Sequence, residues 1–278
     1  MGDRAETTAS AEICAPPAAT TVVVAPAELM AVFISRQIKN GDYVAIGTNL
    51  PVSTAGVLLA HLTHAPDLRI SALSYFTNLS EVEQFHDLGQ VASPRLARWA
   101  EAIWPLDTLL DAVPRMDWCF TGAVQVDMYG NTNLIGVGDD ITNLKVRGPG
   151  SVGSSSVMAT VKQYIVHTGR HNPQVLVKKC DFRSAVGWGD GGDHRARLGL
   201  PGGGPRYVIT PKAIMDFEEG SKRMRLKHLM PGITLDDIVA STGFELVIPA
   251  DMEEMAPPSA QELELLRTKI DINGVLRR

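Results

Sequence analysis

The sequence predicts an α/β fold built on an open, mainly parallel sheet. Short apolar runs of strand length alternate with helical patterns, and helices of this length allow the strands that they connect to pair in parallel. The chain has 278 residues, of which 45% are hydrophobic, which is enough for the core of one large domain.

The first elements define a β–α–β unit. Apolar residues recur at helical spacing through residues 27–41, and Asn-Gly at the end of that stretch favours a left-handed helix exit. A strand is expected at Tyr43–Ile46, followed by a second helix around Val57–Leu62 and an apolar run at Leu68–Phe76. These elements predict two parallel strands joined by a helix.

Ligands of open parallel sheets usually bind beyond the carboxyl ends of the strands. We therefore expect the chemistry in the loops that follow Ile46, Leu73 and Phe120. Further along, the pattern predicts strands at 206–210, 213–218, 223–229 and 244–249, a capped helix at 234–243 and a closing helix at 259–270, where Ser259 and Glu262 have capping-box spacing.

Composition excludes several classes of function. The 26 basic and 31 acidic residues give a net charge of -5, and no block of like charge indicates a nucleic-acid or membrane surface. Cys14, Cys119 and Cys180 are far apart, so they predict reduced thiols in a cytoplasmic protein. Residues 1–26 lack the pattern of a signal peptide and are expected to form a flexible arm before a single domain at 27–278.

Three familiar motifs are incomplete. Residues 148–155 have the glycines of a phosphate-binding P-loop, but Ser154 stands where the lysine is needed. The glycine pairs in 136–140 and 187–192 lack the third glycine of a dinucleotide fingerprint. Asp190, Asp193 and His194 lie among glycines, where aspartate usually caps a turn, so no metal site is expected.

A turn rich in amides, "QVDMYGNTN", occupies residues 125–133. Asp127, Gly130 and Asn131 tolerate positive φ and suit a tight reversal between buried segments. The apolar flanks make unpaired polar groups costly, so the amides of Gln125, Asn131 and Asn133 need partners. A substrate or a partner chain would supply some of them.

This turn resembles the Q-x-D-x-x-G-N-x-N segment of the β-type subunits of class I CoA-transferases. Four further stretches resemble the same subunits in the same order: "ISRQIKNGDYVAIGTNLP" (34–51), "AHLTHAPD" (60–67), "RLGLPGG" (197–203) and "STGFELVIP" (241–249). The resemblance implies a three-layer open, mainly parallel α/β sheet of the CoA-transferase (NagB/RpiA-like) type. It also implies an acyl-CoA substrate, no permanently bound cofactor, and an α-type partner subunit in an α2β2 or larger complex.

The nucleophile of that family is absent from the matching position. In the family a glutamate that follows "APD" attacks the thioester and carries covalent intermediates. Counted from Ala65, Pro66 and Asp67, its position holds Leu73, which has no acid, base or nucleophilic group.

The family's glycine-rich G-x-G-G loop, whose backbone N–H groups would face an oxyanion, matches Gly148 and Gly150, with Ser151 in place of the last glycine. The site residues that the resemblance implies are therefore Asn49, Leu73, Ser74, Gln125, Asn131, Asn133, Gly148, Gly150 and Ser151.

Three interpretations of Leu73 stay open. In the first, a partner subunit supplies the carboxylate, as the resemblance implies for a related two-subunit hydrolase that opens a steroid ring as a CoA thioester. In the second, another carboxylate of this chain substitutes, with Glu81 and Glu83 the nearest in sequence, and in the third the chain is a non-catalytic scaffold. The sequence predicts an acyl-CoA enzyme subunit and leaves transfer, hydrolysis and the acyl group undecided.

Overall fold

The predicted β–α–β unit forms with small changes in its boundaries. The structure, a computed structural model, describes residues 23–72, 75–77, 88, 93–98, 100–151 and 153–278. Helix α1 (Pro26–Gln37) leads into β1 (Tyr43–Ile46), α2 (Pro51–Thr63) and β2 (Arg69–Ala72), and β1 and β2 pair in parallel. Prolines at the starts of both helices fit because the first turn needs no N–H donor there.

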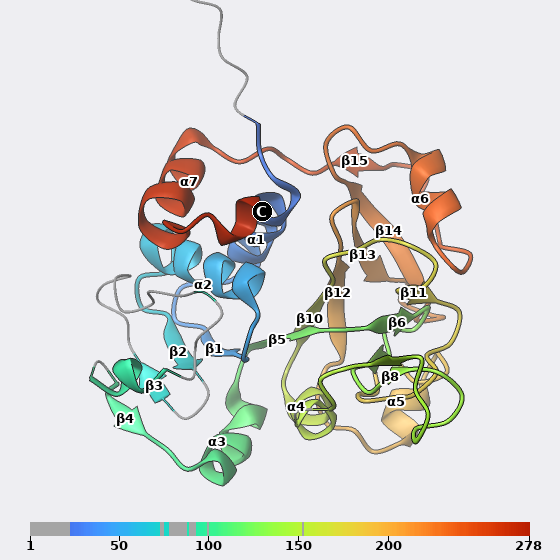
Figure 1. Cartoon of the computed structure of the whole chain (residues 1–278), viewed down its shortest axis with the longest axis horizontal. Coiled ribbons are helices and arrows are strands. Elements are labelled where there is room, and N and C mark those ends of the chain that lie inside the picture. The colour runs from blue at the N-terminus through green and yellow to red at the C-terminus, as the bar shows by residue number, and fades with distance from the viewer. Residues whose placement is uncertain (1–22, 73–74, 78–87, 89–92, 99, 152) are drawn as a thin grey trace, which may run out of the picture.

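A ten-stranded sheet crosses the molecule in the order β15-β14-β13-β12-β10-β5-β1-β2-β3-β4 (Figure 1). The central strands from β12 to β2 are all parallel, and antiparallel strands flank them on both sides. The remaining strands of this sheet are β3 (Tyr75–Thr77), β4 (Ala102–Ile103), β5 (Trp118–Gly122), β10 (Tyr164–His167), β12 (Pro205–Ile209), β13 (Ala213–Phe217), β14 (Met224–Leu229) and β15 (Glu253–Glu254).

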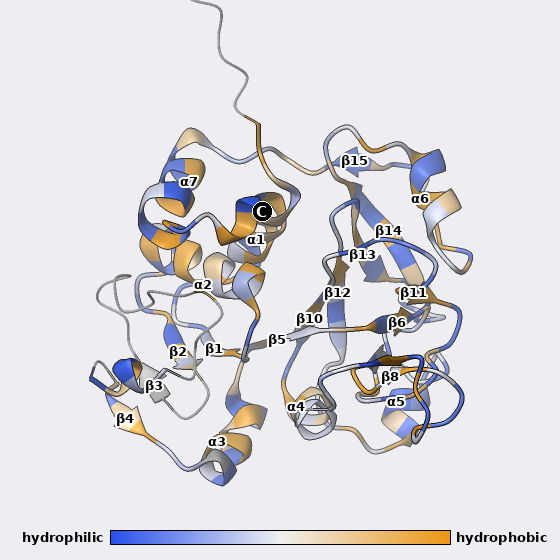
Figure 2. Cartoon of the chain, in the orientation of Figure 1, coloured by the Kyte–Doolittle hydropathy of each residue, from blue (hydrophilic) through white to orange (hydrophobic). Residues whose placement is uncertain are grey.

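The sheet separates two hydrophobic cores, which confirms the three-layer α/β architecture. Alternate residues of each strand face opposite layers: Val44 and Ile46 pack with α1 and α2, whereas Tyr43 packs with the other layer. Figure 2 shows mainly apolar colouring on α2 and hydrophilic residues on α7 (Ala260–Leu265).

The second layer contains short elements around α3 and α4. Its helices are α3 (Leu106–Ala112), η3 (Val113–Arg115), α4 (Ser154–Thr160), α5 (His194–Arg197) and α6 (Leu235–Ser241). Two small sheets join them, one of β11 (Leu176–Val177), β6 (Gln125–Asp127) and β7 (Thr132–Asn133), the other of β8 (Gly136–Val137) and β9 (Val146–Arg147).

Three sequence expectations need correction. The run Leu68–Phe76 contains two antiparallel strands, β2 and β3, instead of one strand. The strand expected at 244–249 is absent, and only an isolated bridge from Val247 to Arg225 forms in that described stretch. The closing helix is α7 followed by a π-helical turn, η4 (Leu266–Ile270), although its predicted Ser259 and Glu262 capping box is confirmed.

The two ends of the domain meet at an ion pair whose carboxylate is buried and whose guanidinium is partly exposed. Arg267 donates to both carboxylate oxygens of Glu28, at 2.7 and 2.8 Å, and Glu28 is only 1% exposed. This pair joins α1 to η4, and η5 (Val275–Arg277) also contacts α1. Among the described residues, the helices lack the combination of length and apolar character that a membrane span requires.

Candidate functional site

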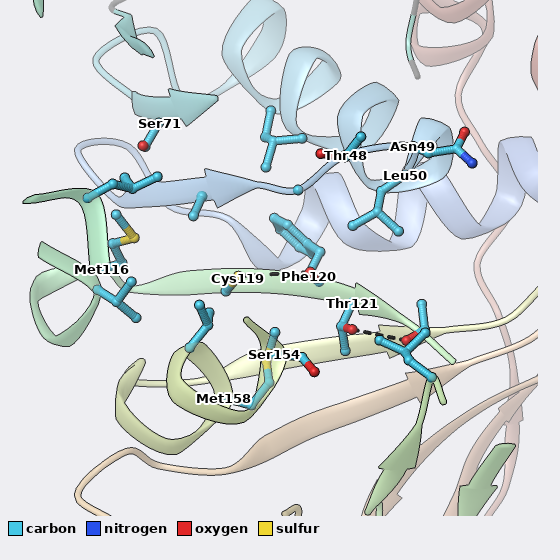
Figure 3. A pocket seen from close by; sticks show the side chains of 18 of the residues that line it. Thr48, Asn49, Leu50, Ser71, Met116, Cys119, Phe120, Thr121, Ser154 and Met158 are labelled. Carbon is cyan, nitrogen blue, oxygen red and sulfur yellow. Dashed lines mark hydrogen bonds between the residues drawn. The ribbon is translucent and has the colours of Figure 1, made fainter. Parts of the chain in front are cut away.

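A pocket of about 480 Å³ lies at the carboxyl ends of β1 and β5, on the side of the sheet that faces α3 and α4 (Figure 3). The predicted loop after Ile46 contributes Gly47–Leu50 to the lining, whereas the lining residues that follow Phe120, Thr121 and Gly122, are still part of β5. Pockets of this size hold ligands as large as a drug molecule.

Small side chains from three neighbouring strands form the floor of the pocket. Ser71, Ala45 and Cys119 are aligned across β2, β1 and β5, because Ala45 is the register partner of both other residues. All three line the pocket. Their small volumes leave space below α3 and α4 that larger side chains at these positions would fill.

The walls of the pocket are apolar. Leu109, Leu110 and Val113 contribute from α3 and η3, and Val157 and Met158 contribute from α4. Among the described residues that line the pocket, none is an aspartate, glutamate, histidine, lysine or arginine. An apolar ligand segment would be favoured here, since burial removes both surfaces from water.

Cys119 is the most reactive side-chain type in this lining, but its environment makes it inert. Burial raises the pKa of its thiol to about 12, so the sulfur is protonated near neutral pH. The thiolate is the nucleophilic form of cysteine. The pocket therefore offers no ionised nucleophile among its described residues.

The rim of the pocket is the loop between β1 and α2. Asn49 lines the pocket with a left-handed backbone, at φ 55°, and Asn tolerates this conformation better than most residues. The Leu50 side chain packs over the ends of the two strands. A Cβ atom added to Gly47 would lie 3.2 Å from this side chain, and one added to Gly122 would lie 3.6 Å from it. Glycine at both strand ends therefore allows the loop to lie close to the sheet.

A buried hydroxyl–imidazole contact lies next to this rim, outside the pocket lining. Ser53, in the first turn of α2, lies 3.0 Å from Nε2 of His167 at the end of β10. Burial lowers the pKa of His167 to about 4, so the imidazole is neutral at pH 7. We interpret the pair as a positioning contact, because neither residue belongs to the pocket lining.

The amide turn is buried and bonded within the protein. Asn131 Nδ2 donates to both carboxylate oxygens of Asp127 and to Gly189 O, and its Oδ1 accepts from the N–H groups of Gly187 and Gly189. Gly130 has a φ of 70°, as the sequence predicts for this turn. The network fixes the β6–β7 turn against residues 187–189.

Gln125 and Asn133 form a second part of this network. Asn133 Nδ2 donates to Gln125 Oε1 at 2.7 Å and to Gly136 O, and Gln125 Oε1 also accepts from the N–H of Asp181. None of the three amide residues belongs to the pocket lining. Their partners in this structure come from the chain itself.

The glycine-rich loop reaches the pocket through only part of its length. Ser151 lines the pocket, whereas the N–H groups of Gly148 and Gly150 donate to the carbonyls of Ile135 and Leu134. Those two donors hold the loop against the two residues that connect β7 to β8. Leu73, Ser74, Glu81 and Glu83 lie outside the residues that the structure describes.

Sequence reasoning missed Ser154 as a site residue. It considered this position only as the absent lysine of a P-loop, yet Ser154 lines the pocket from the start of α4. Its side chain is 6% exposed, and Oγ has no hydrogen-bond partner among the described residues. The sequence feature that could have indicated this site residue is a serine directly after a glycine, at the start of a helix.

The glycine-rich segment with Asp190 and His194 forms local contacts. The N–H of Asp190 donates to Nδ1 of His194, and the Asp190 carboxylate pairs with Arg183 at 3.1 Å. In the described part of the chain, no three His, Cys, Asp or Glu side chains are grouped as a metal site would require.

Comparison with known proteins identifies relatives of this chain in sequence and in fold. The model of the coenzyme A transferase family matches residues 27–241. The B-type subunit of glutaconate CoA-transferase from Acidaminococcus fermentans is 36% identical over 253 residues, which cover 88% of this chain and 91% of that protein. The B-type subunit of 3-oxoadipate CoA-transferase from Pseudomonas knackmussii is 34% identical, with 86% and 91% covered.

More distant similarity extends to an enzyme with a different reaction. The IpdB subunit of a cholesterol ring-cleaving hydrolase from Mycobacterium tuberculosis is 27% identical over 88% of this chain and 94% of its own length. The crystal structure of the Acidaminococcus glutaconate CoA-transferase superposes with a TM-score of 0.81 at 32% identity, covering 92% of this chain and 98% of the matched chain.

Proposed function

The chain belongs to the coenzyme A transferase family as a β-type subunit, and on this premise we propose that it binds an acyl-CoA thioester in the pocket at the ends of β1 and β5. The observation that carries the proposal is the position of that pocket. Open parallel sheets bind ligands beyond the carboxyl ends of their strands, and the two loops there, at Gly47–Leu50 and at Pro149–Ser151, both contribute to its lining.

The active enzyme is a heteromer of this chain with an α-type subunit. Both relatives above 30% identity are named as the B-type subunit of a CoA-transferase, and the resemblance covers nearly all of each. Co-expression with the α-type subunit should give a stable complex with equal numbers of the two chains. A monodisperse, fully active monomer of this chain alone would overturn this part of the proposal.

The catalytic carboxylate belongs to the α-type partner. Leu73 occupies the position of the family glutamate, and the described pocket lining contains neither a carboxylate nor an ionised thiol. The covalent route of transfer needs a carboxylate oxygen that bonds to the thioester carbon while the CoA sulfur leaves. Hydrolysis instead needs a base that activates water, which a partner side chain can provide.

The hydrolase alternative rests on this same replacement. A relative at 27% identity is a ring-cleaving hydrolase, so thioester or C–C hydrolysis is the second candidate reaction, and a scaffold subunit is the third. Incubation of the complex with acyl-CoA, followed by borohydride treatment and mass spectrometry of both chains, separates them. An adduct on a glutamate of either chain supports transfer, and release of free acid without an adduct supports hydrolysis.

Leu73→Glu tests whether position 73 belongs to the site. We expect this variant to lose the native reaction or to gain a trapped glutamyl-CoA adduct, since a carboxylate beside the thioester either reacts or suffers a desolvation cost. Leu73→Met is the matched control, because it preserves an apolar side chain of similar volume. An unchanged product, substrate affinity and stability in Leu73→Glu would exclude position 73 from the site.

A further inference from the structure

The chemistry of the pocket defines which acyl group fits it. Leu109, Leu110 and Val113 of α3 and η3 line the pocket together with Val157 and Met158 of α4, and the described lining carries no cationic side chain. A carboxylate that entered between these walls would leave water without gaining an ion pair from the described residues of this chain. The desolvation of an unpaired ion costs several kcal/mol.

This lining contrasts with the substrates for which the relatives are named. Glutaconate and 3-oxoadipate are dicarboxylates, so their CoA thioesters keep one free carboxylate on the acyl group. The pocket of this chain has no described arginine or lysine to receive such a group.

One polar group in the pocket has no partner among the described residues. Ser154 Oγ is buried without a hydrogen bond there, and Figure 3 shows it on α4, on the side that faces Thr121 and the end of β5. The Thr121 hydroxyl is already bonded, since it donates to Gly122 O at 3.0 Å. A buried hydroxyl without a partner is costly, so a ligand oxygen that accepts from Ser154 would relieve that cost.

We propose that the pocket binds the uncharged, apolar acyl chain of a monocarboxylic CoA thioester, with an oxygen substituent of that chain bonded to Ser154. This assignment rests on the proposed function, because it names the substrate class of the same site. The volume of about 480 Å³ lies within the range of small-molecule binding sites.

The first experiment compares two thioesters on the assembled complex of this chain with its α-type partner. Hexanoyl-CoA and glutaryl-CoA are titrated by calorimetry, and we expect hexanoyl-CoA to bind more than about a hundredfold tighter, as an unpaired buried carboxylate implies. Equal or tighter binding of glutaryl-CoA would overturn the inference but leave the proposed function intact. Failure of both thioesters to bind would overturn the proposed function as well.

A charge at the wall should reverse part of this preference. Leu110 is 37% exposed, so Leu110→Arg can be accommodated, and its guanidinium should improve binding of glutaryl-CoA relative to hexanoyl-CoA by about fivefold, the factor expected of a partly exposed ion pair. Val239→Arg, at an exposed position on α6, is the matched control and should leave the ratio unchanged. The same ratio in both variants would contradict placement of the acyl chain beside Leu110.

Ser154→Ala tests the polar contact. We expect it to weaken binding of 3-hydroxyhexanoyl-CoA relative to hexanoyl-CoA by about two- to tenfold, the factor that one neutral hydrogen bond contributes. The thermal stability of Ser154→Ala should stay unchanged or rise, because the buried hydroxyl has no described partner to lose. Ser155→Ala, at an exposed neighbouring position, is the control and should leave the ratio of the two binding affinities unchanged. A Ser154→Ala variant that affects both thioesters equally would remove Ser154 from the proposal.

Discussion

Replacement of Asn131 by Ala should destabilise the fold more than it harms the chemistry directly. The Asn131 side chain is fully buried and accepts from Gly187 N at 2.9 Å and from Gly189 N at 3.2 Å. Alanine would leave both N–H groups buried without acceptors, each at a cost of about 1–3 kcal/mol. The expected loss is therefore on the order of 2–6 kcal/mol, a large part of the stability of a typical domain.

Urea unfolding followed by circular dichroism measures this loss. Asn143→Ala is the matched control, because Asn143 is exposed and should change stability by less than about 0.5 kcal/mol. If Asn131→Ala unfolds like the wild type but loses activity, the amide serves a ligand and the structural reasoning is wrong. The same pair of measurements on Gln125→Ala extends the test to the second part of the network.

Three further predictions concern other parts of the fold. Gly130→Val should prevent folding, because φ is 70° at this residue and an added Cβ would lie 2.6 Å from the Phe217 ring. Gly41→Asn is the control and should keep the wild-type melting temperature, since no described atom lies within 4 Å of a Cβ added there. Burial holds the pKa of His167 at about 4, so the unfolded chain binds the proton first, and the contribution of His167 to stability should fall by at most about 1.4 kcal/mol per pH unit as the pH drops from 6.5 toward 4. Burial also lowers the pKa of His171 to about 4, so the total slope contains both imidazoles and the comparison with His167→Gln isolates one of them. A His167→Gln variant with an unchanged slope over that range would contradict this assignment. Glu28→Gln should cost about 1–3 kcal/mol in denaturant unfolding, because Arg267 would lose its charged partner but remains partly exposed, and a cost below about 0.5 kcal/mol would show that the pair is energetically neutral.

Local sequence patterns predicted the central part of the fold because they act over short distances. The strand Tyr43–Ile46 has its predicted boundaries, and the pairing of Thr234 with Asp237 caps α6 at its predicted start. The segment 244–249 has the apolar character of a strand but lacks a long neighbour, since only Val247 forms a bridge to Arg225. A segment forms a strand only when a neighbouring strand is available for pairing, and the sequence of the segment itself does not contain that information.

The candidate site was predictable only in location. Sheet topology indicated the loop after Ile46, which contributes to the pocket, and the residues after Phe120, of which Thr121 and Gly122 contribute from the end of β5. The walls from α3 and α4 were not predictable, because tertiary contacts bring Leu110 and Val157 to the same pocket. For the amide turn, the sequence identified the polar residues but not their partners, because residue types alone do not show that Gln125 and Asn133 form a hydrogen bond with each other.

The ion pair between Glu28 and Arg267 has a consequence for biosynthesis. The two residues are 239 positions apart, so the ribosome releases the first helix of the domain long before it makes the partner of Glu28. Until Arg267 emerges, the Glu28 carboxylate has the N–H of Ala25 as its hydrogen-bond donor but lacks the guanidinium that completes the pair. The contact between the first and last helical segments of the domain can therefore form only after the segment that carries Arg267 has been translated.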